Sequence, residues 1–346
     1  MATTYDFIAQ NKRRTWLLVL LFPVTFALLG LVFLFGFSYF SETHKDPAEA
    51  YLPVIIDQVD YGEAPLARAA ADTAVFGMIV LPGLWLLAMI WIIVSYFSGD
   101  RMLLRGAGAV EIYRNEQPEI YRLVENLCLR EGLPMPRVYL IRDGSLNAFA
   151  TGRDPKHASI ALTVGIVSRL ERAELEGVIA HELSHVKNRD IRLMLITVAG
   201  ISFCTFMSEV CFRMALSSSR SRSSKSDKGG GAVVLLAAGV FFLLYGYLIA
   251  PLIRLAVSRT REYQADASAA LMTRNPGALA RALEKITKDP TVEVLDAHAS
   301  MAAMCIANPL SKTGLFVQLS GLLATHPPIQ KRIAKLREMD ADVLAR

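Results

Sequence analysis

The chain has 346 residues, of which 53% are hydrophobic and 20% are charged. This composition excludes a disordered or low-complexity chain, and its positive mean hydropathy of +0.35 argues against an ordinary water-soluble enzyme. The net charge of +5, from 37 Lys and Arg against 32 Asp and Glu, is modest for a nucleic-acid-binding protein, so no nucleic-acid partner is expected.

Two long uncharged segments lie in the first hundred residues. Residues 16–40 and 73–99 hold no charged side chain, and a helix of either length rises more than the bilayer core of about 30 Å. The segment 41–72 between them carries seven acidic and two basic side chains, whereas arginines flank the outer ends of the pair. The positive-inside rule places both ends in the cytoplasm and the acidic loop outside. We therefore predict an N-terminal membrane hairpin over residues 1–100.

Residues 101–190 have the composition of a water-soluble region. Apolar residues at helical spacing predict a helix over Pro118–Arg130 that ends at Gly132. A second helix is expected from about Glu171 to Asp190. Between the helices, short apolar runs predict strands of a small antiparallel β-sheet. These strands are Val138–Ile141, Asn147–Thr151 and Ser159–Thr163.

Residues 191–257 contain two further apolar segments. Residues 229–253 are long enough to cross a bilayer, but 193–208 amount to only about 24 Å of helix. The flexible loop 217–231 between them is basic and prefers the cytoplasm, which conflicts with a simple four-span topology. Either the loop is exported against its preference or the pair enters the bilayer and returns. We adopt four spans and keep the re-entrant pair as the alternative.

The last part of the chain, residues 258–346, again has the composition of a water-soluble region and is expected to be mostly helical. A long run without Gly or Pro ends before Asn275-Pro276, a pair typical of a helix cap and first turn. A final helix is expected after Pro327-Pro328. The fold predicted is therefore a mainly α integral membrane protein with a small sheet.

The motif HELSH at residues 181–185 carries the chemistry. Residues four apart lie on one face of a helix, so His181 and His185 can bind one metal ion, with Glu182 beside them to act on its water. A random shuffle of this composition gives about 0.005 such matches, which makes chance a poor explanation. The alternative is a helix face that holds two solvated histidines.

A catalytic zinc ion needs a third protein ligand. The segment after the last apolar run offers Glu262 and Asp266, four apart and hence on one helix face. Glu262 can coordinate the ion, and Asp266 can accept the far ring N–H of a ligand histidine. The alternative is a surface helix whose arginines and carboxylates form solvated ion pairs. With the HELSH helix present, we favour the ligand interpretation.

Several motifs together resemble a known family. HELSH, the segment from Arg261 to Asp266, and THPPIQKRI at Thr325–Ile333 are similar to motifs of the HtpX-type heat-shock metalloproteases of bacterial membranes. These proteases are relatives of the eukaryotic CAAX prenyl-protein endoproteases. The resemblance extends over nearly the whole chain and includes YDFIAQNKRRTW near the start and NAFATG at Asn147–Gly152.

The resemblance implies a zincin-like metalloendopeptidase. Because the third and fourth apolar segments lie between HELSH and Glu262, we expect them to form a hairpin inserted between the two ligand helices. It implies one zinc ion per chain held by His181, His185 and Glu262, with Glu182 as general base and Asp266 as the carboxylate behind a ligand histidine. It further implies that His326 and Arg332 act at the reacting carbonyl. From the residues alone, a polar residue at a helix start and a solvated helix face explain these two equally well.

The same resemblance implies that the strand at Asn147, Ala148 and Phe149 pairs with extended substrate. An asparagine before a strand is by itself more often a turn residue, although a peptidase does need an exposed strand edge. Because the HELSH helix and Glu262 each lie within ten residues of an apolar segment, the site is expected at the cytoplasmic face of the bilayer.

These features predict a multi-pass protein of the bacterial inner membrane with its active site facing the cytoplasm. Its partners would be the lipid bilayer and membrane-protein substrates, and its activity the cleavage of misfolded or damaged membrane proteins. A prenyl-protein protease and a non-catalytic membrane scaffold with structural zinc remain alternatives. The sequence does not reveal the oligomeric state.

Overall fold

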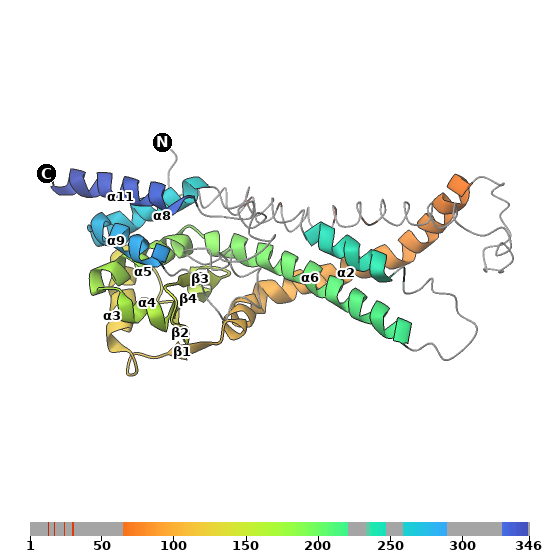
Figure 1. Cartoon of the computed structure of the whole chain (residues 1–346). Coiled ribbons are helices and arrows are strands. Elements are labelled where there is room, and N and C mark those ends of the chain that lie inside the picture. Colours follow the sequence, from red (N-terminus) through yellow and green to blue (C-terminus); the bar gives the residue numbers. More distant parts are fainter. Residues whose placement is uncertain are drawn as a thin grey trace. The chain divides into compact units, whose positions relative to one another are not determined.

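The computed structural model describes residues 65–220, 235–246, 259–288 and 327–344, together with a few isolated positions. The chain divides into two compact units (Figure 1). The first unit includes Ile93–Ser202 and the described residues after 258, and the second includes the described residues of Leu18–Ile92 and Phe203–Tyr245. The described part is mainly helical, as predicted.

The first unit contains a four-stranded sheet of order β1-β2-β4-β3. The strands are β1 (Ala109–Ile112), β2 (Arg137–Ile141), β3 (Ala148–Gly152) and β4 (Ala158–Thr163). Three of them lie within one residue of the predicted bounds. The sequence analysis missed β1, whose four residues are too few to show a clear apolar alternation.

The sheet is mixed, and the prediction of an antiparallel sheet was wrong. β3 turns back along β4 in antiparallel register, with Ala150 opposite Ile160. This reversal leaves β4 parallel to β2, with Val138 opposite Ile160, whereas β1 is antiparallel to β2. β3 therefore forms one edge of the sheet and β1 the other.

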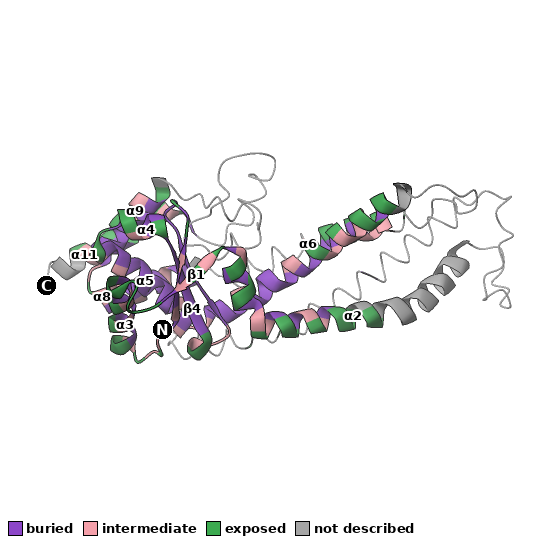
Figure 2. Ribbon diagram, turned by 90° about the horizontal axis from the view of Figure 1, so that it is seen from below, coloured by how far each residue is buried: buried purple, intermediate pink, exposed green. Residues whose placement is uncertain are grey.

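Helix α5 (Arg172–Lys187) is the central element of this unit. It packs against β3 and β4 on one side and against α8 (Arg259–Thr273) and α9 (Pro276–Lys288) on another, and it is buried along most of its length (Figure 2). Helices α3 (Pro118–Glu131) and α4 (Val164–Arg169) complete this layer, and α11 (Ile329–Leu344) packs on α8 and α9. The predicted stop of α3 is confirmed, because Gly132 is left-handed with φ 63°.

The opposite face of the sheet packs on two longer helices, α2 (Pro65–Gly106) and α6 (Asp190–Arg220). Phe149 and Ala161 of the sheet form a buried cluster there with Leu104 of α2 and with Leu195 and Val198 of α6. Helices thus cover both faces of the sheet. Their packing holds β3, the edge strand, in place beside α5.

The helix predicted over Glu171–Asp190 is two helices. α5 ends at Lys187, and Arg189 adopts the left-handed φ of 59° before α6 begins at Asp190. A non-glycine residue in this region carries a conformational cost of about 1–2 kcal/mol, so surrounding contacts must stabilise the bend. The bend brings the side chain of Asp190 back onto α5.

Two described helical segments are long and apolar enough to cross a membrane, Trp85–Gly106 and Asp190–Ser217, and Leu235–Gly246 is a shorter apolar helix. The first lies partly within the predicted span 73–99, and the second extends the segment 193–208 that looked too short. The predicted span 16–40 lies outside the described residues, apart from isolated positions.

In the second unit, α6 packs on the helix Leu235–Gly246. Phe203 contacts Phe242 with ring centroids 6.3 Å apart, and the Ser208 hydroxyl donates a hydrogen bond of 2.9 Å to the Gly239 carbonyl. The contact residues of the second helix come earlier in the chain as those of α6 come later, so the two helices run antiparallel.

Candidate metal centre and active site

The site is built where α5 and α8 pack together. Small side chains at this contact, Ser184 and Ala265, let the two backbones approach, and the Ser184 hydroxyl lies 3.5 Å from the Ala265 carbonyl oxygen. The motif histidines lie one turn apart on α5, and Glu262 and Asp266 lie one turn apart on α8. The packing therefore turns the two predicted pairs toward each other.

His181, His185 and Glu262 converge on one point. Their ligand atoms all lie within 4.8 Å of one another. The two Nε2 atoms are 3.2 Å apart, and the Glu262 carboxylate oxygens lie 3.7 Å from His181 Nε2 and 3.6 Å from His185 Nε2. Three ligand groups predicted from sequence thus form one cluster.

The outer nitrogen of each histidine faces a carboxylate. His181 Nδ1 lies 3.0 Å from Asp266 Oδ1, and His185 Nδ1 lies 3.0 Å from Asp190 Oδ2. Because an ionised carboxylate only accepts, each Nδ1 donates a hydrogen bond there, and in the neutral ring Nε2 then presents a lone pair to the cluster. This is the tautomer that a metal ligand requires.

The donor set fits a divalent metal ion. A tetrahedral ion with bonds of about 2.0–2.1 Å holds neighbouring ligand atoms about 3.4 Å apart. The observed separations of 3.2–3.7 Å lie close to this value. Two imidazoles and one carboxylate are also the ligands of a catalytic zinc site that keeps one position open.

Arg332 of α11 lies behind this cluster. It is fully buried, and its Nε and Nη2 atoms donate hydrogen bonds of 2.8 and 2.7 Å to the two carboxylate oxygens of Asp266. Its Nη1 atom lies 3.5 Å from Glu262 Oε2. Although burial raises the pKa of a carboxyl, Arg332 outweighs it and lowers the pKa of Asp266 to about 2. Asp266 is therefore held as the carboxylate that His181 needs.

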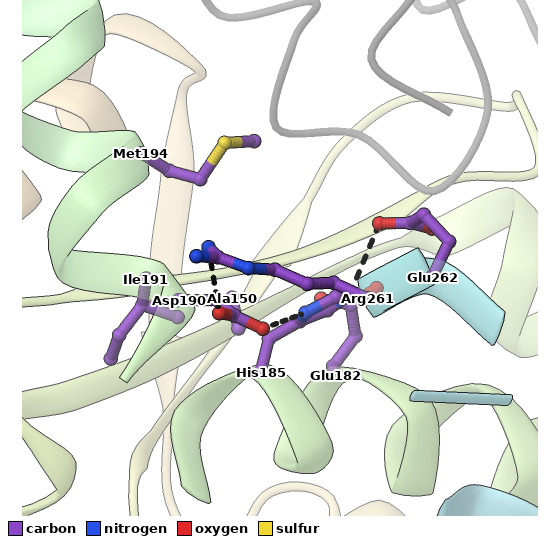
Figure 3. Close-up of a pocket in the computed structure, with 8 residues that line it drawn as sticks. All are labelled: Ala150, Glu182, His185, Asp190, Ile191, Met194, Arg261 and Glu262. Atoms are coloured by element: carbon purple, nitrogen blue, oxygen red, sulfur yellow. Dashed lines mark hydrogen bonds and ion pairs between the residues drawn. The ribbon is translucent and has the colours of Figure 1, made fainter. Parts of the chain in front are cut away.

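Glu182 faces a small cavity on the other side of the cluster (Figure 3). The cavity has a volume of about 30 Å³, enough for a water molecule. The described residues that line it are Ala150, Glu182, His185, Asp190, Ile191, Met194, Arg261 and Glu262. The backbone N–H of Ala150 donates to the Glu182 carboxylate, yet burial prevails and raises the pKa of Glu182 to about 7. Such a group can take up and return a proton near neutral pH.

The two histidines differ in electrostatic environment. Burial, with the positive charge of Arg332, lowers the pKa of His181 to about 4. Burial also acts to lower the pKa of His185, but the hydrogen bond that it donates to Asp190 and the charge of Glu262 outweigh burial and raise this pKa to about 9. A metal ion bound at Nε2 requires both rings to be neutral.

The other predicted site residues do not line the cavity or lie outside the described residues. Asn147 is buried, and its side-chain oxygen accepts a hydrogen bond of 2.9 Å from the Ala148 amide. Ala148 and Phe149 point into the cores on the two faces of the sheet. None of the three lines the cavity, whereas Ala150 does. His326 lies outside the described residues.

Sequence reasoning missed three residues of the site. Asp190 and Arg261 lie next to the recognised motifs, but their side chains reach the site only through the bend after α5 and the packing of α8. Ala150 contributes a backbone amide, which no side-chain pattern reveals. For these three residues, the one feature of the sequence that could have indicated a place in the site was the position of Arg261 directly before Glu262.

Comparison with known proteins agrees with this geometry. The model of peptidase family M48 matches residues 114–340. A "Protease HtpX homolog" of Bacteroides fragilis is 38% identical over 95% of this chain and 97% of its own length. Proteins of the same name from Streptococcus gordonii and Tropheryma whipplei are 36% and 42% identical, over 97% and 73% of this chain and 99% and 84% of their own lengths.

Among solved structures, "Crystal Structure of S. mikatae Ste24p" aligns with a TM-score of 0.41 and 18% identity, over 77% of this chain and 64% of that one. The family model covers the HELSH helix, the Glu262 helix and most of α11. The chain therefore belongs to peptidase family M48, among the HtpX-type metalloproteases.

Proposed function

We propose that this protein is a zinc-dependent membrane endopeptidase of the bacterial inner membrane, which cleaves misfolded or damaged membrane proteins at the cytoplasmic face. The observation that carries the proposal is the convergence of His181, His185 and Glu262 beside a cavity that contains the carboxylate of Glu182. The family membership supports peptide-bond cleavage.

In the proposed reaction, His181, His185 and Glu262 would hold one zinc ion beside the cavity. The ion would supply a Lewis acid for the scissile carbonyl and for the attacking water. Glu182 takes the proton of the attacking water and later delivers it to the leaving amine. The Ala150 amide keeps the Glu182 carboxylate turned toward the cavity.

The β3 edge supports binding of an extended substrate. The Thr163 amide donates to the Asn147 carbonyl, so Asn147 pairs with β4 through its backbone. Because hydrogen-bonding directions alternate along an antiparallel strand, the backbone carbonyls of Ala148 and Ala150 turn toward the open edge, whereas their amides donate to the Asn147 and Glu182 side chains. A substrate strand can pair there directly beside Glu182. Asn147 and Phe149 would then support this edge from behind.

Two cationic or donor groups are proposed to stabilise the developing oxyanion, as the family resemblance implies. Arg332 has the buried positive charge for this role, although its shortest hydrogen bonds go to Asp266. It would act through the field that it creates rather than by direct contact with the substrate. For His326 we keep the proposal that it contacts the developing oxyanion directly.

The position next to apolar helices supports a membrane substrate. α6, which is long and apolar enough to cross a bilayer, begins at Asp190, and Asp190 accepts a hydrogen bond from the ligand His185. α2 exposes several large apolar side chains, including Trp85, Ile90 and Phe97. A peptidase held at a bilayer surface meets loops and tails of membrane proteins before soluble chains.

The decisive experiment compares the purified full chain with Glu182→Gln in detergent. We expect the substitution to retain zinc and to reduce cleavage of an unfolded membrane protein by about 10²–10⁴-fold, because the amide cannot accept the proton. Glu176→Gln is the matched control, since Glu176 lies on the same helix and contacts Arg130 instead of the cavity. Its zinc content and cleavage rate should both match those of the parent.

The two alternatives give different outcomes. A prenyl-protein protease would cut a prenylated peptide and leave the unfolded membrane protein intact. A structural zinc scaffold would bind zinc without cleaving either substrate, and Glu182→Gln would leave its cellular phenotype unchanged. Absence of zinc from the purified parent would contradict the metal centre itself.

A further inference from the structure

Asp190 occupies a position that the motif alone does not explain. It is the first residue of α6, directly after the left-handed Arg189, and its side chain is 8% exposed. One carboxylate oxygen, Oδ2, lies 3.0 Å from His185 Nδ1. The other, Oδ1, accepts a hydrogen bond of 3.1 Å from Nη1 of Arg261. Figure 3 shows this chain of contacts along one wall of the cavity.

Arg261 comes from the helix that supplies the third ligand. Its side chain is 6% exposed, and it precedes Glu262 on α8. Asp190 therefore links a ligand histidine on α5 to the residue beside the ligand carboxylate on α8. Three helices contribute to this link, and the contribution of α6 is its first residue.

The arrangement repeats the one at the other histidine. His181 contacts Asp266, and Asp266 is held by the guanidinium of Arg332. In each case a buried arginine contacts a buried carboxylate, and this carboxylate accepts a hydrogen bond from Nδ1 of one histidine. The carboxylates come from different helices, α8 and α6, and so do the arginines, from α11 and α8, so one local motif does not account for the repetition.

We propose that Asp190 and Arg261 are positioning residues for the metal site, which fix the ring orientation and tautomer of His185. Without Asp190, the proton of a neutral His185 is free to move to Nε2, where it would block coordination. The ring would also rotate more freely, because its outer nitrogen would lack this acceptor. Arg261 fixes the carboxylate itself, so its loss should act through Asp190.

In this proposal, the first residue of α6 also orients a ligand histidine. Because Asp190 begins an apolar helix long enough to span a membrane, correct placement of that helix and correct geometry of His185 depend on the same residue. The inference rests on the proposed metal site.

The test measures zinc affinity in the full chain by competition with a chelator. All variants carry Glu182→Gln, so that self-cleavage does not alter the sample. Asp190→Ala should weaken zinc binding by about 10–100-fold, the usual effect of removing a carboxylate behind a ligand histidine. Asp190→Asn retains an acceptor for the Nδ1 proton and should lose less affinity than Asp190→Ala. Cobalt in place of zinc should show an altered visible spectrum in Asp190→Ala, because the ligand geometry changes.

Asp100→Asn is the matched control. Asp100 forms a 2.6 Å ion pair with Arg137 in the same unit, away from the cavity, and its loss should leave zinc affinity and the cobalt spectrum unchanged. Arg261→Ala should weaken binding, and adding it to Asp190→Ala should cause little further loss, because both act on one contact.

Each outcome bears on a separate claim. A folded Asp190→Ala chain that binds zinc within about twofold of the parent would overturn the positioning role. If Asp190→Ala does not fold, Asp190→Asn provides the test. A zinc affinity and a cobalt spectrum of Asp190→Asn equal to those of the parent would also overturn the positioning role. A parent chain that binds no zinc would instead refute the metal site of the proposed function.

Discussion

At the scale of single residues, the buried guanidinium of Arg332 shows how one side chain joins the helices of the site. It is 0% exposed, and it makes a two-point contact with Asp266 while lying 3.5 Å from Glu262. A buried ion pair adds little stability over an apolar core, but the loss of one partner leaves a buried charge uncompensated. Arg332 is thus expected to matter more for stability than Arg337, the other arginine of α11.

We predict that Arg332→Ala lowers the free energy of unfolding by about 3–5 kcal/mol, because Asp266 stays buried without its partner. Arg332→Lys should recover little of this loss, since an ammonium group cannot make the two-point contact. Thermal unfolding of the detergent-solubilised chain measures both.

The control for this prediction is Arg337→Ala on the same helix. Arg337 pairs with Glu284, but its side chain is 66% exposed, and such pairs contribute about 0–1 kcal/mol. Equal shifts of the unfolding midpoint for Arg332→Ala and Arg337→Ala would contradict a special role of the buried guanidinium.

At the scale of elements, local signals predicted helix caps and strand positions better than the pairing of the strands. The Asn275 side chain caps α9 as expected, accepting a hydrogen bond of 3.0 Å from the Ala278 amide. Apolar runs predicted three strands but could not give their pairing, and β2 and β4 proved parallel. Pairing depends on contacts between segments about twenty residues apart, for which a strand's own residues carry no signal.

The contact between α9 and α11 gives a prediction at this scale. Asp340 of α11 accepts a hydrogen bond of 3.1 Å from the Gly277 amide in the first turn of α9. Asp340→Ala removes this partner and should cost about 1 kcal/mol, as the loss of a helix cap does. Chemical denaturation of the purified chain measures the change.

Glu338→Ala is the comparison for Asp340→Ala, because Glu338 is an exposed carboxylate on the same helix. It should change the unfolding free energy by less than about 0.5 kcal/mol. A larger loss for Glu338→Ala than for Asp340→Ala would mean that general helix charge, rather than the tertiary cap, stabilises α11.

At the scale of the whole molecule, the candidate metal site joins segments that are far apart in the chain. His181 and Glu262 are separated in sequence by α6 and by the apolar helix Leu235–Gly246. A ligand that binds only the folded chain shifts the folding equilibrium by mass action. The metal should therefore stabilise the chain as a whole.

We predict that a chelator lowers the thermal unfolding midpoint of the full chain and that added zinc restores it. At a free zinc concentration of 100 times the dissociation constant, the stabilisation should be about 2.7 kcal/mol. Glu262→Ala, which lacks one ligand, should show a much smaller response to chelator. A parent midpoint that does not respond to chelator and zinc would contradict the prediction.

Membrane topology can be tested with single cysteines in a chain whose four native cysteines are replaced. The four-span topology predicts that Ser223→Cys in the basic loop and Ser41→Cys in the acidic loop both react with an impermeant maleimide applied from outside the inner membrane. Labelling of Ser41→Cys alone would favour the re-entrant pair. Intact and opened membrane vesicles distinguish protection from lack of reactivity.

The sequence by itself determined the three groups that converge on the metal point, because the spacing of His181 and His185 and of Glu262 and Asp266 is a local property of a helix. It also determined the bounds of α3, the starts of α9 and α11, and the apolar segments, since caps and hydropathy are local as well. Only the tertiary structure decided the mixed sheet, the bend at Arg189, and the contacts of Asp190 and Arg332 with the two histidines. Those features arise from packing between distant segments, and a buried carboxylate or arginine has the same local sequence signature as an exposed one.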